Sequence, residues 1–214
     1  MNDSLVSLKV QIDARDPACA RVRVQVQVVP ACTQGELEIR GRLMGPSCLY
    51  ADTIEVAYAL VPEGSGVAVA RIPEANRWHP QTPFLYAGPV EVWHHGQLLA
   101  RRTLRLGLRT LASDRAGLRV NGQVLALRVQ RVQSLNEEQA RGLRAQGVNV
   151  LVAPPEPELF DLADRVGFFV VCETDAATLA AFAQHPSCLG WLDPHAATAG
   201  ASPVELPGLR VISP

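Results

Sequence analysis

The pattern of apolar residues changes once along the chain, near residue 113, and this change constrains the fold more than any other feature. Before it, apolar and polar residues alternate, as in 5–14, 21–29 and 67–72. A period of two is typical of strands with one buried face. After it, apolar runs at 150–153 and 168–172 alternate with segments of helical pattern. Such runs indicate a parallel sheet buried on both faces.

The first part, residues 1–113, is predicted to be an immunoglobulin-like β-sandwich. About seven short strands separated by turn residues, with no helical stretch, fit an antiparallel sandwich of this type. Asp16-Pro17, Gly45-Pro46 and His95-Gly96 are among the turn signals. The Cys–Trp–Cys pattern of antibody domains is absent, so the sequence implies the architecture alone.

The second part, residues 114–214, is predicted to be a β/α domain. Asn121-Gly122 between two apolar runs favours a two-residue hairpin turn. A helix is expected to begin at Ser134 or Asn136, because either side chain can cap its first turn. The remaining expected elements are a helix over 157–166 closed by Gly167, a helix over 176–184, a strand over 188–193 and a last strand over 208–213.

The charge and cysteine content exclude several classes of function. The 20 Lys and Arg nearly balance the 21 Asp and Glu, which argues against nucleic acid or an anionic membrane as partner. No stretch reaches the ~18 apolar residues of a membrane span, and the start lacks the pattern of a signal peptide. We therefore expect a cytoplasmic protein. The 5 cysteines do not have the spacing of a zinc site, so no metal or cofactor is expected.

Six segments carry a resemblance to a known family. The stretch 71–86, RIPEANRWHPQTPFLY, resembles the P…W-s-P-x-x-P-x-L-Y segment that closes the immunoglobulin-like domain of glycoside hydrolase family 2, the β-galactosidase, β-glucuronidase and β-mannosidase group. The other segments similar to the family's motifs, in the family's order, are 107–109, 118–129, 143–150, 159–173 and 185–191. Together these segments extend over about the last two-thirds of the chain.

The resemblance implies a sandwich followed by a truncated TIM-type barrel. A complete barrel takes about 250 residues, so 214 residues leave room for about half of one after the sandwich. The residues kept from the family's motifs, which include Asn121-Gly122, Asn149, Asp164 and Pro186, are interpreted as residues that serve folding. The sugar-contacting motifs after the first two strands are replaced at 131–133 and 152–155.

The resemblance also implies that hydrolysis is lost. Retaining glycosidases of this kind need two carboxyl groups about 5–5.5 Å apart. The family's acid/base glutamate falls on Ala196, and its nucleophile belongs to a seventh strand that this chain lacks. We therefore favour a non-catalytic pseudo-enzyme, acting as an interaction or carbohydrate-binding module. The alternative is a glycoside hydrolase with an active site rebuilt around Glu173 and Asp193, or one completed by another chain.

Two tryptophans are candidate ligand-binding residues, since Trp93 and Trp191 could stack on sugar rings. His94 and His95 are adjacent on a strand, so they are expected to face opposite sides and not to share a metal ion. A half barrel has two open strand edges, which attract other chains unless they are covered. The expected partners are therefore a carbohydrate and a second copy or another chain at these edges.

Overall fold

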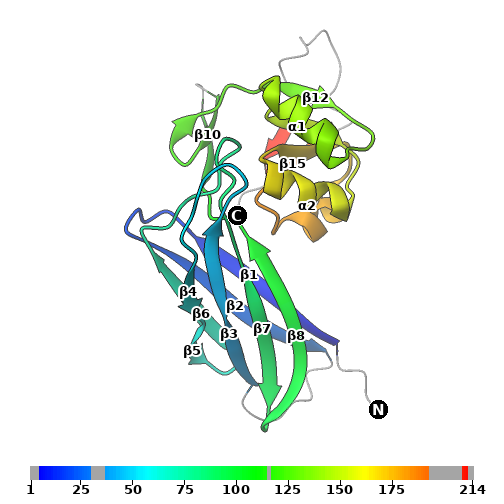
Figure 1. Cartoon of the computed structure of the whole chain (residues 1–214). Coiled ribbons are helices and arrows are strands. Elements are labelled where there is room, and N and C mark those ends of the chain that lie inside the picture. The colour runs from blue at the N-terminus through cyan, green and yellow to red at the C-terminus, as the bar shows by residue number, and fades with distance from the viewer. Residues whose placement is uncertain (1–4, 30–36, 115–116, 193–208, 212–214) are drawn as a thin grey trace. The chain divides into compact units, whose positions relative to one another are not determined.

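The computed structural model describes residues 5–29, 37–114, 117–192 and 209–211 (Figure 1). The chain forms two compact units. The first unit consists of Met1–Ser47, Thr53–Asn76 and Tyr86–Leu108, and the second consists of Cys48–Asp52, Arg77–Leu85 and Arg109–Pro214. The boundary expected at residue 113 stays a prediction.

The first unit is built from two four-stranded sheets around one apolar core. One sheet has the order β1-β2-β6-β5, with β1 Leu5–Asp13, β2 Cys19–Val29, β6 Val67–Pro73 and β5 Val61–Gly64. The other has the order β4-β3-β7-β8, with β4 Val56–Ala59, β3 Leu37–Ser47, β7 Leu85–His94 and β8 Gln97–Leu106. Alternate residues of both sheets, such as Val22, Leu43 and Val90, are fully buried in the same core. The expectation of a β-rich fold is therefore confirmed.

The second unit contains a five-stranded sheet, in the order β12-β13-β14-β15-β16. The strands are β12 Val129–Arg131, β13 Val150–Ala153, β14 Phe169–Cys172, β15 Cys188–Leu192 and β16 Leu209–Val211. The first four run parallel, and β16 is antiparallel to β15. The connections carry helices α1 Glu137–Ala145, α2 Pro157–Val166 and α3 Ala176–Leu179. A small antiparallel sheet is formed by β9 Leu111–Asp114, β10 Gly117–Val120 and β11 Gln123–Val124.

The ends of these elements follow from local chemistry. The side-chain Oδ1 of Asn136 accepts a hydrogen bond from the Gln139 backbone N–H at 2.9 Å, and the Gln139 side chain accepts one from the Asn136 N–H at 3.1 Å. This reciprocal cap selects Asn136, rather than Ser134, as the start of α1. Helix α2 has its expected bounds and ends at Gly167, whose φ of 90° suits a residue without a Cβ.

Strands β13 and β14 are buried on both faces. On one face, Leu151 and Val170 share a core with residues of the helices, such as Phe160. On the other, Val150, Val152, Phe169 and Val171 share a core with Trp78 and with residues of the β9–β11 sheet. The Trp78 and Phe169 rings meet edge to face, with centroids 5.0 Å apart. The continuous apolar runs of the sequence thus form strands that have no exposed face.

One edge of the five-stranded sheet is covered by the chain itself. Strand β16 pairs with β15 through Gly190 and Val211, among others. The approach is close, because a Cβ placed on Gly190 would lie 1.9 Å from the Arg210 carbonyl oxygen. The last strand expected from the sequence is therefore present, and it pairs with β15 and becomes the edge strand on that side of the sheet. At the opposite edge, no strand among the described residues pairs with the outer side of β12.

The Gly190→Ala substitution should displace β16 from the sheet. A methyl group at Gly190 collides with the backbone of Arg210, so we expect the free energy of unfolding to fall by about 1–3 kcal/mol. Urea denaturation measures the loss, and hydrogen exchange should show faster exchange at 209–211. Gly142→Ala is the matched control, because a Cβ at that position meets no atom within 4 Å. Unchanged protection at 209–211 in Gly190→Ala would contradict this account of the edge.

Candidate functional site

Glu173 lies directly after β14, at the carboxyl end of the parallel strands. Ligand and catalytic sites of open parallel sheets lie at this end. Its Oε2 atom forms an ion pair with the Nη1 atom of Arg131, the last residue of β12. The two side chains are 54% and 56% exposed, and their pair spans the end of β13, which lies between the two strands. The Glu173 carboxylate therefore faces a cation.

Two other carboxylates, those of Asp175 and Asp193, follow Glu173 in the chain. Asp193, the suggested partner of Glu173, lies outside the described residues. Asp175 is close to Glu173 in sequence, but its Oδ1 accepts a hydrogen bond from the Thr178 N–H at 2.8 Å and so caps α3. That cap holds the pKa of Asp175 below its usual value. The described structure does not bring a second carboxylate into contact with Glu173.

The two candidate tryptophans lie in different units. Trp191, near the end of β15, is half-buried and packs against the core on the helix side of the sheet. Trp93, on β7, is half-buried in the first unit. Its Nε1 donates to Oε2 of Glu91 at 3.1 Å, and the Arg40 guanidinium carbon lies 4.7 Å from the centre of the ring. A sugar that stacked on that face of Trp93 would have to displace Arg40.

The two neighbouring histidines differ from the sequence expectation. His95 has a φ of 47° at the start of the turn after β7, which breaks the alternation of a strand. The two rings consequently lie together, with centroids 4.1 Å apart, rather than on opposite sides. Nε2 of His94 is buried and has no hydrogen-bond partner among the described residues. Two imidazoles alone are fewer than the three protein ligands that a catalytic zinc site uses.

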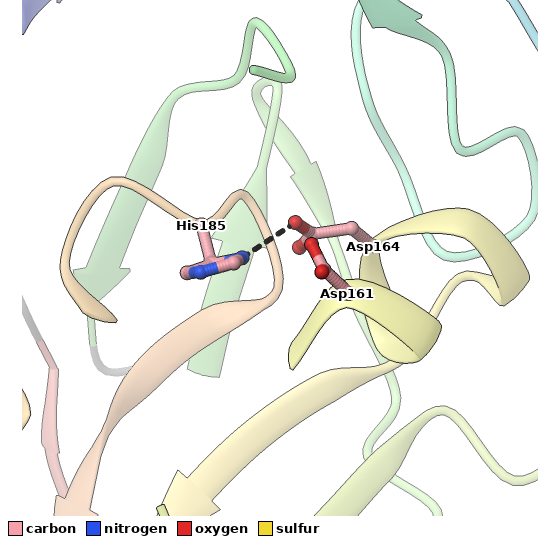
Figure 2. Close-up of side chains that lie close together, drawn as sticks. All are labelled: Asp161, Asp164 and His185. Atoms are coloured by element: carbon pink, nitrogen blue, oxygen red, sulfur yellow. Dashed lines mark hydrogen bonds and ion pairs between the residues drawn. The ribbon is translucent and has the colours of Figure 1, made fainter. Parts of the chain in front are cut away.

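Asp164 is a buried acidic residue that bonds to two other segments of the second unit, and sequence reasoning identified it only as one of the residues that serve folding. It lies on α2 and is 1% exposed. Its Oδ2 is 2.7 Å from Nδ1 of His185, and its Oδ1 accepts a hydrogen bond from the Ser187 N–H at 3.0 Å (Figure 2). Its backbone carbonyl accepts the Nε1–H of Trp78 at 2.9 Å. One residue thus joins α2, the turn before β15 and the segment that contains Trp78.

A metal ion is the functional alternative for this cluster. Asp161, Asp164 and His185 offer ligand atoms within 4.8 Å of one another, and they are the only such group of three in the described part of the chain (Figure 2). However, both carboxylate oxygens of Asp164 already have partners. His185 also precedes β15, so the cluster lies at the amino ends of the strands, away from the end where sites occur. Its geometry is that of a hydrogen-bonded structural cluster.

The buried cysteines do not form a nucleophile. Cys172 and Cys188 are fully buried on neighbouring strands. Burial raises the pKa of each thiol to about 12, so neither is a thiolate near neutral pH. Thiolates are the reactive form of cysteine. The two residues therefore serve as packing groups in the core.

Comparisons with known proteins give one curated relative and many similar structures. No protein-family model matches the sequence. β-Galactosidase BoGH2A of Bacteroides ovatus is 28% identical over 123 residues, covering 48% of this chain and 14% of that protein. A glycosyl hydrolase family 2 member from Bacteroides cellulosilyticus superposes with a TM-score of 0.65 at 19% identity, over 86% of this chain and 30% of that one.

A second solved structure extends the similarity. The β-glucuronidase from Ruminococcus gnavus in complex with D-glucuronic acid matches with a TM-score of 0.65 and 14% identity, over 89% of this chain and 36% of that chain. At these low sequence identities, the two structural matches show that the fold is shared. The chain spans well under half the length of each of these three proteins. No helix among the described residues is long and apolar enough to cross a membrane.

Substitution of Asp164 should destabilise the second unit strongly. Asp164→Ala leaves His185 and the Ser187 N–H without their buried partner, so we expect a loss of about 3–5 kcal/mol in the free energy of unfolding. Asp161→Ala, on the exposed side of α2, is the control and should cost clearly less. Thermal unfolding measures both variants. EDTA or added Zn²⁺ should leave the melting temperature unchanged, and a rise with Zn²⁺ would show that the cluster binds metal.

Alkylation of the native protein should separate the buried from the accessible cysteines. At about pH 8, a thiol with a pKa of about 12 is ionised in about one molecule in ten thousand. Iodoacetamide should therefore label Cys19 and Cys48, which are partly exposed, before Cys172 and Cys188. Peptide mass spectrometry reads out each site, and denatured protein is the control. Rapid native labelling of Cys188 would show that its strand opens.

Proposed function

We propose, from the premise that this chain is a glycoside hydrolase family 2-like protein, that it no longer hydrolyses glycosides and acts as a binding module. In this proposal, residues 1–113 are the immunoglobulin-like sandwich of the family. Residues 114–214 are the first half of a TIM-type barrel, in which β12 to β15 are the first four strands. The order and parallel direction of these strands support the assignment.

The ion pair between Glu173 and Arg131 carries the proposal. Retaining hydrolysis needs an acid/base and a nucleophile, two carboxyl groups about 5–5.5 Å apart. At the carboxyl end of this sheet, Glu173 is instead engaged by a guanidinium group. The motif alignment adds that the family's acid/base position is occupied by Ala196, a residue without a transferable proton. That position lies outside the described residues.

The packing of the sheet is a second support. In a TIM-type barrel, the face of each strand opposite the helices looks toward the barrel axis. Here the corresponding face of β13 and β14 is filled by Trp78 and by Leu118 and Val120 of β10. Val152 and Val171 on that face are 2% and 0% exposed. The covered face supports the proposal that this sheet folds without the remaining strands of a barrel.

Carbohydrate is the ligand class that we propose. The relatives whose names describe a β-galactosidase and a β-glucuronidase act on sugars, and a module that keeps their scaffold can keep this ligand. Trp93 and Trp191 remain the proposed stacking residues. Association with a second copy or another chain is proposed at the outer sides of β12 and β16, neither of which pairs with a further strand among the described residues.

A hydrolase is the second candidate, favoured by the exposure of Glu173 at the carboxyl end of the strands. In that case Glu173 and Asp193 would form a rebuilt carboxylate pair, or another chain would supply the missing groups. The binding module and a hydrolase rebuilt around Glu173 and Asp193 predict opposite results in one assay of this chain.

Aryl β-glycosides separate the candidates. For the wild-type chain with β-galactoside, β-glucuronide and β-mannoside substrates, we expect release of the aryl group at the uncatalysed rate, because a proton donor and a nucleophile are not paired. Glu173→Gln and Asp193→Asn should give the same rate. Glu138→Gln, on the exposed side of α1, controls for the loss of one negative charge. Turnover by the wild type that disappears in Glu173→Gln or Asp193→Asn would establish the hydrolase.

A further inference from the structure

A groove of about 370 Å³ runs between the end of β12 and helix α1, within the second unit. Its volume lies in the range of small-molecule sites. None of its lining residues carries a charge. They are Gln130, Val132, Ser134, Leu135, Gln139, Gly142, Leu143 and Gln146. We call this the Gly142 groove.

Gly142 is the unusual member of this lining. It is exposed in the middle of α1, where glycine is a poorer helix former than alanine. Two structural reasons for a glycine are absent: its backbone is helical, and a Cβ built there would meet no atom within 4 Å. The missing side chain therefore does not serve packing. The absence of a side chain at Gly142 leaves room in the groove and exposes the backbone of α1 to a bound molecule.

The polar groups of the rim are uncharged and partly unused. Gln139 accepts a hydrogen bond through Oε1 in the cap of α1, so its NH₂ group is left to donate. Gln130 donates through Nε2 to the Arg131 carbonyl, so its Oε1 is left to accept. The side chains of Ser134 and Gln146 make no hydrogen bond to any other described residue. The rim thus offers both donors and acceptors.

The floor of the groove is apolar. Val132, Leu135 and Leu143 are half-buried and pack on the core on the helix side of the sheet. An apolar floor beneath neutral amide and hydroxyl groups matches a molecule with one C–H face and a rim of hydroxyl groups. A charged ligand would find no counter-charge among the lining residues. A helix from another chain would leave the rim amides buried without partners.

We propose that the Gly142 groove binds a neutral saccharide, with the C–H face of one sugar ring on the apolar floor and its hydroxyl groups bonded to the glutamine amides. The choice of a sugar over another neutral polyol rests on the proposed function. The lining of the groove includes neither Trp93 nor Trp191. The sugar ring lies against α1 at Gly142, where the side chain of a larger residue would fill the space.

Titration of the full chain with methyl β-D-galactopyranoside and with cellobiose tests the site. We expect saturable shifts of the glutamine side-chain amide signals in NMR spectra. Gly142→Ala should weaken the binding about fivefold or more, because its methyl group projects into the groove. Gly142→Leu should abolish it. Both variants should keep or raise the melting temperature, since each is a better helix former than glycine, so that lost binding cannot be attributed to misfolding.

Glu138→Ala, an exposed residue of α1 outside the groove, is the matched control and should bind as the wild type does. Binding that survives in Gly142→Leu but is lost in Trp93→Ala overturns the groove while it supports the proposed carbohydrate function. Binding of glucuronic acid but of neither neutral sugar overturns the neutral class. If none of these sugars, nor the polysaccharides of which they are units, binds at millimolar concentration, both the groove and the carbohydrate function are wrong.

Discussion

The buried carboxylate of Asp164 is the interaction on which the second unit depends. A carboxylate withdrawn from water is stable only when its oxygens are paired, and here each oxygen has one partner, from His185 and Ser187. The same residue receives the Trp78 indole N–H at its carbonyl. Trp78 is in turn held at its own carbonyl by the side chain of Asn121. The buried polar groups of these four segments, which lie far apart in sequence, therefore obtain their hydrogen-bond partners only when the segments pack together.

This network links three of the segments that resemble the family's motifs. The segment around Trp78, the α2 segment around Asp164 and the segment around His185 are three of the resembling stretches, and their characteristic residues bond to each other rather than to a ligand.

The cover on the faces and edges of the five-stranded sheet decides which of its surfaces are accessible to a partner. A parallel sheet needs cover on both faces and at its edges. Helices cover one face, Trp78 and the β9–β11 sheet cover the other, and β16 covers the β15 edge. Among the described residues, the outer sides of β12 and β16 have no partner strand, and the Gly142 groove lies beside β12. A surface of this kind suits the binding role that we propose.

The sequence by itself determined the local structure and the resemblance. The Asn121-Gly122 turn and Gly167 act through interactions that span a few residues, so the pattern was sufficient to place them. For the start of α1 the pattern left Ser134 and Asn136 open, and the cap seen in the structure selects Asn136. The tertiary structure alone decided three things: the antiparallel direction of β16, the pairing of Glu173 with Arg131, and the placement of Arg40 over Trp93. Each of these joins residues that are distant in the chain, and side-chain periodicity carries no information about which distant residues will meet. The Gly142 groove belongs to the same class, since it exists only where β12 and α1 are brought together.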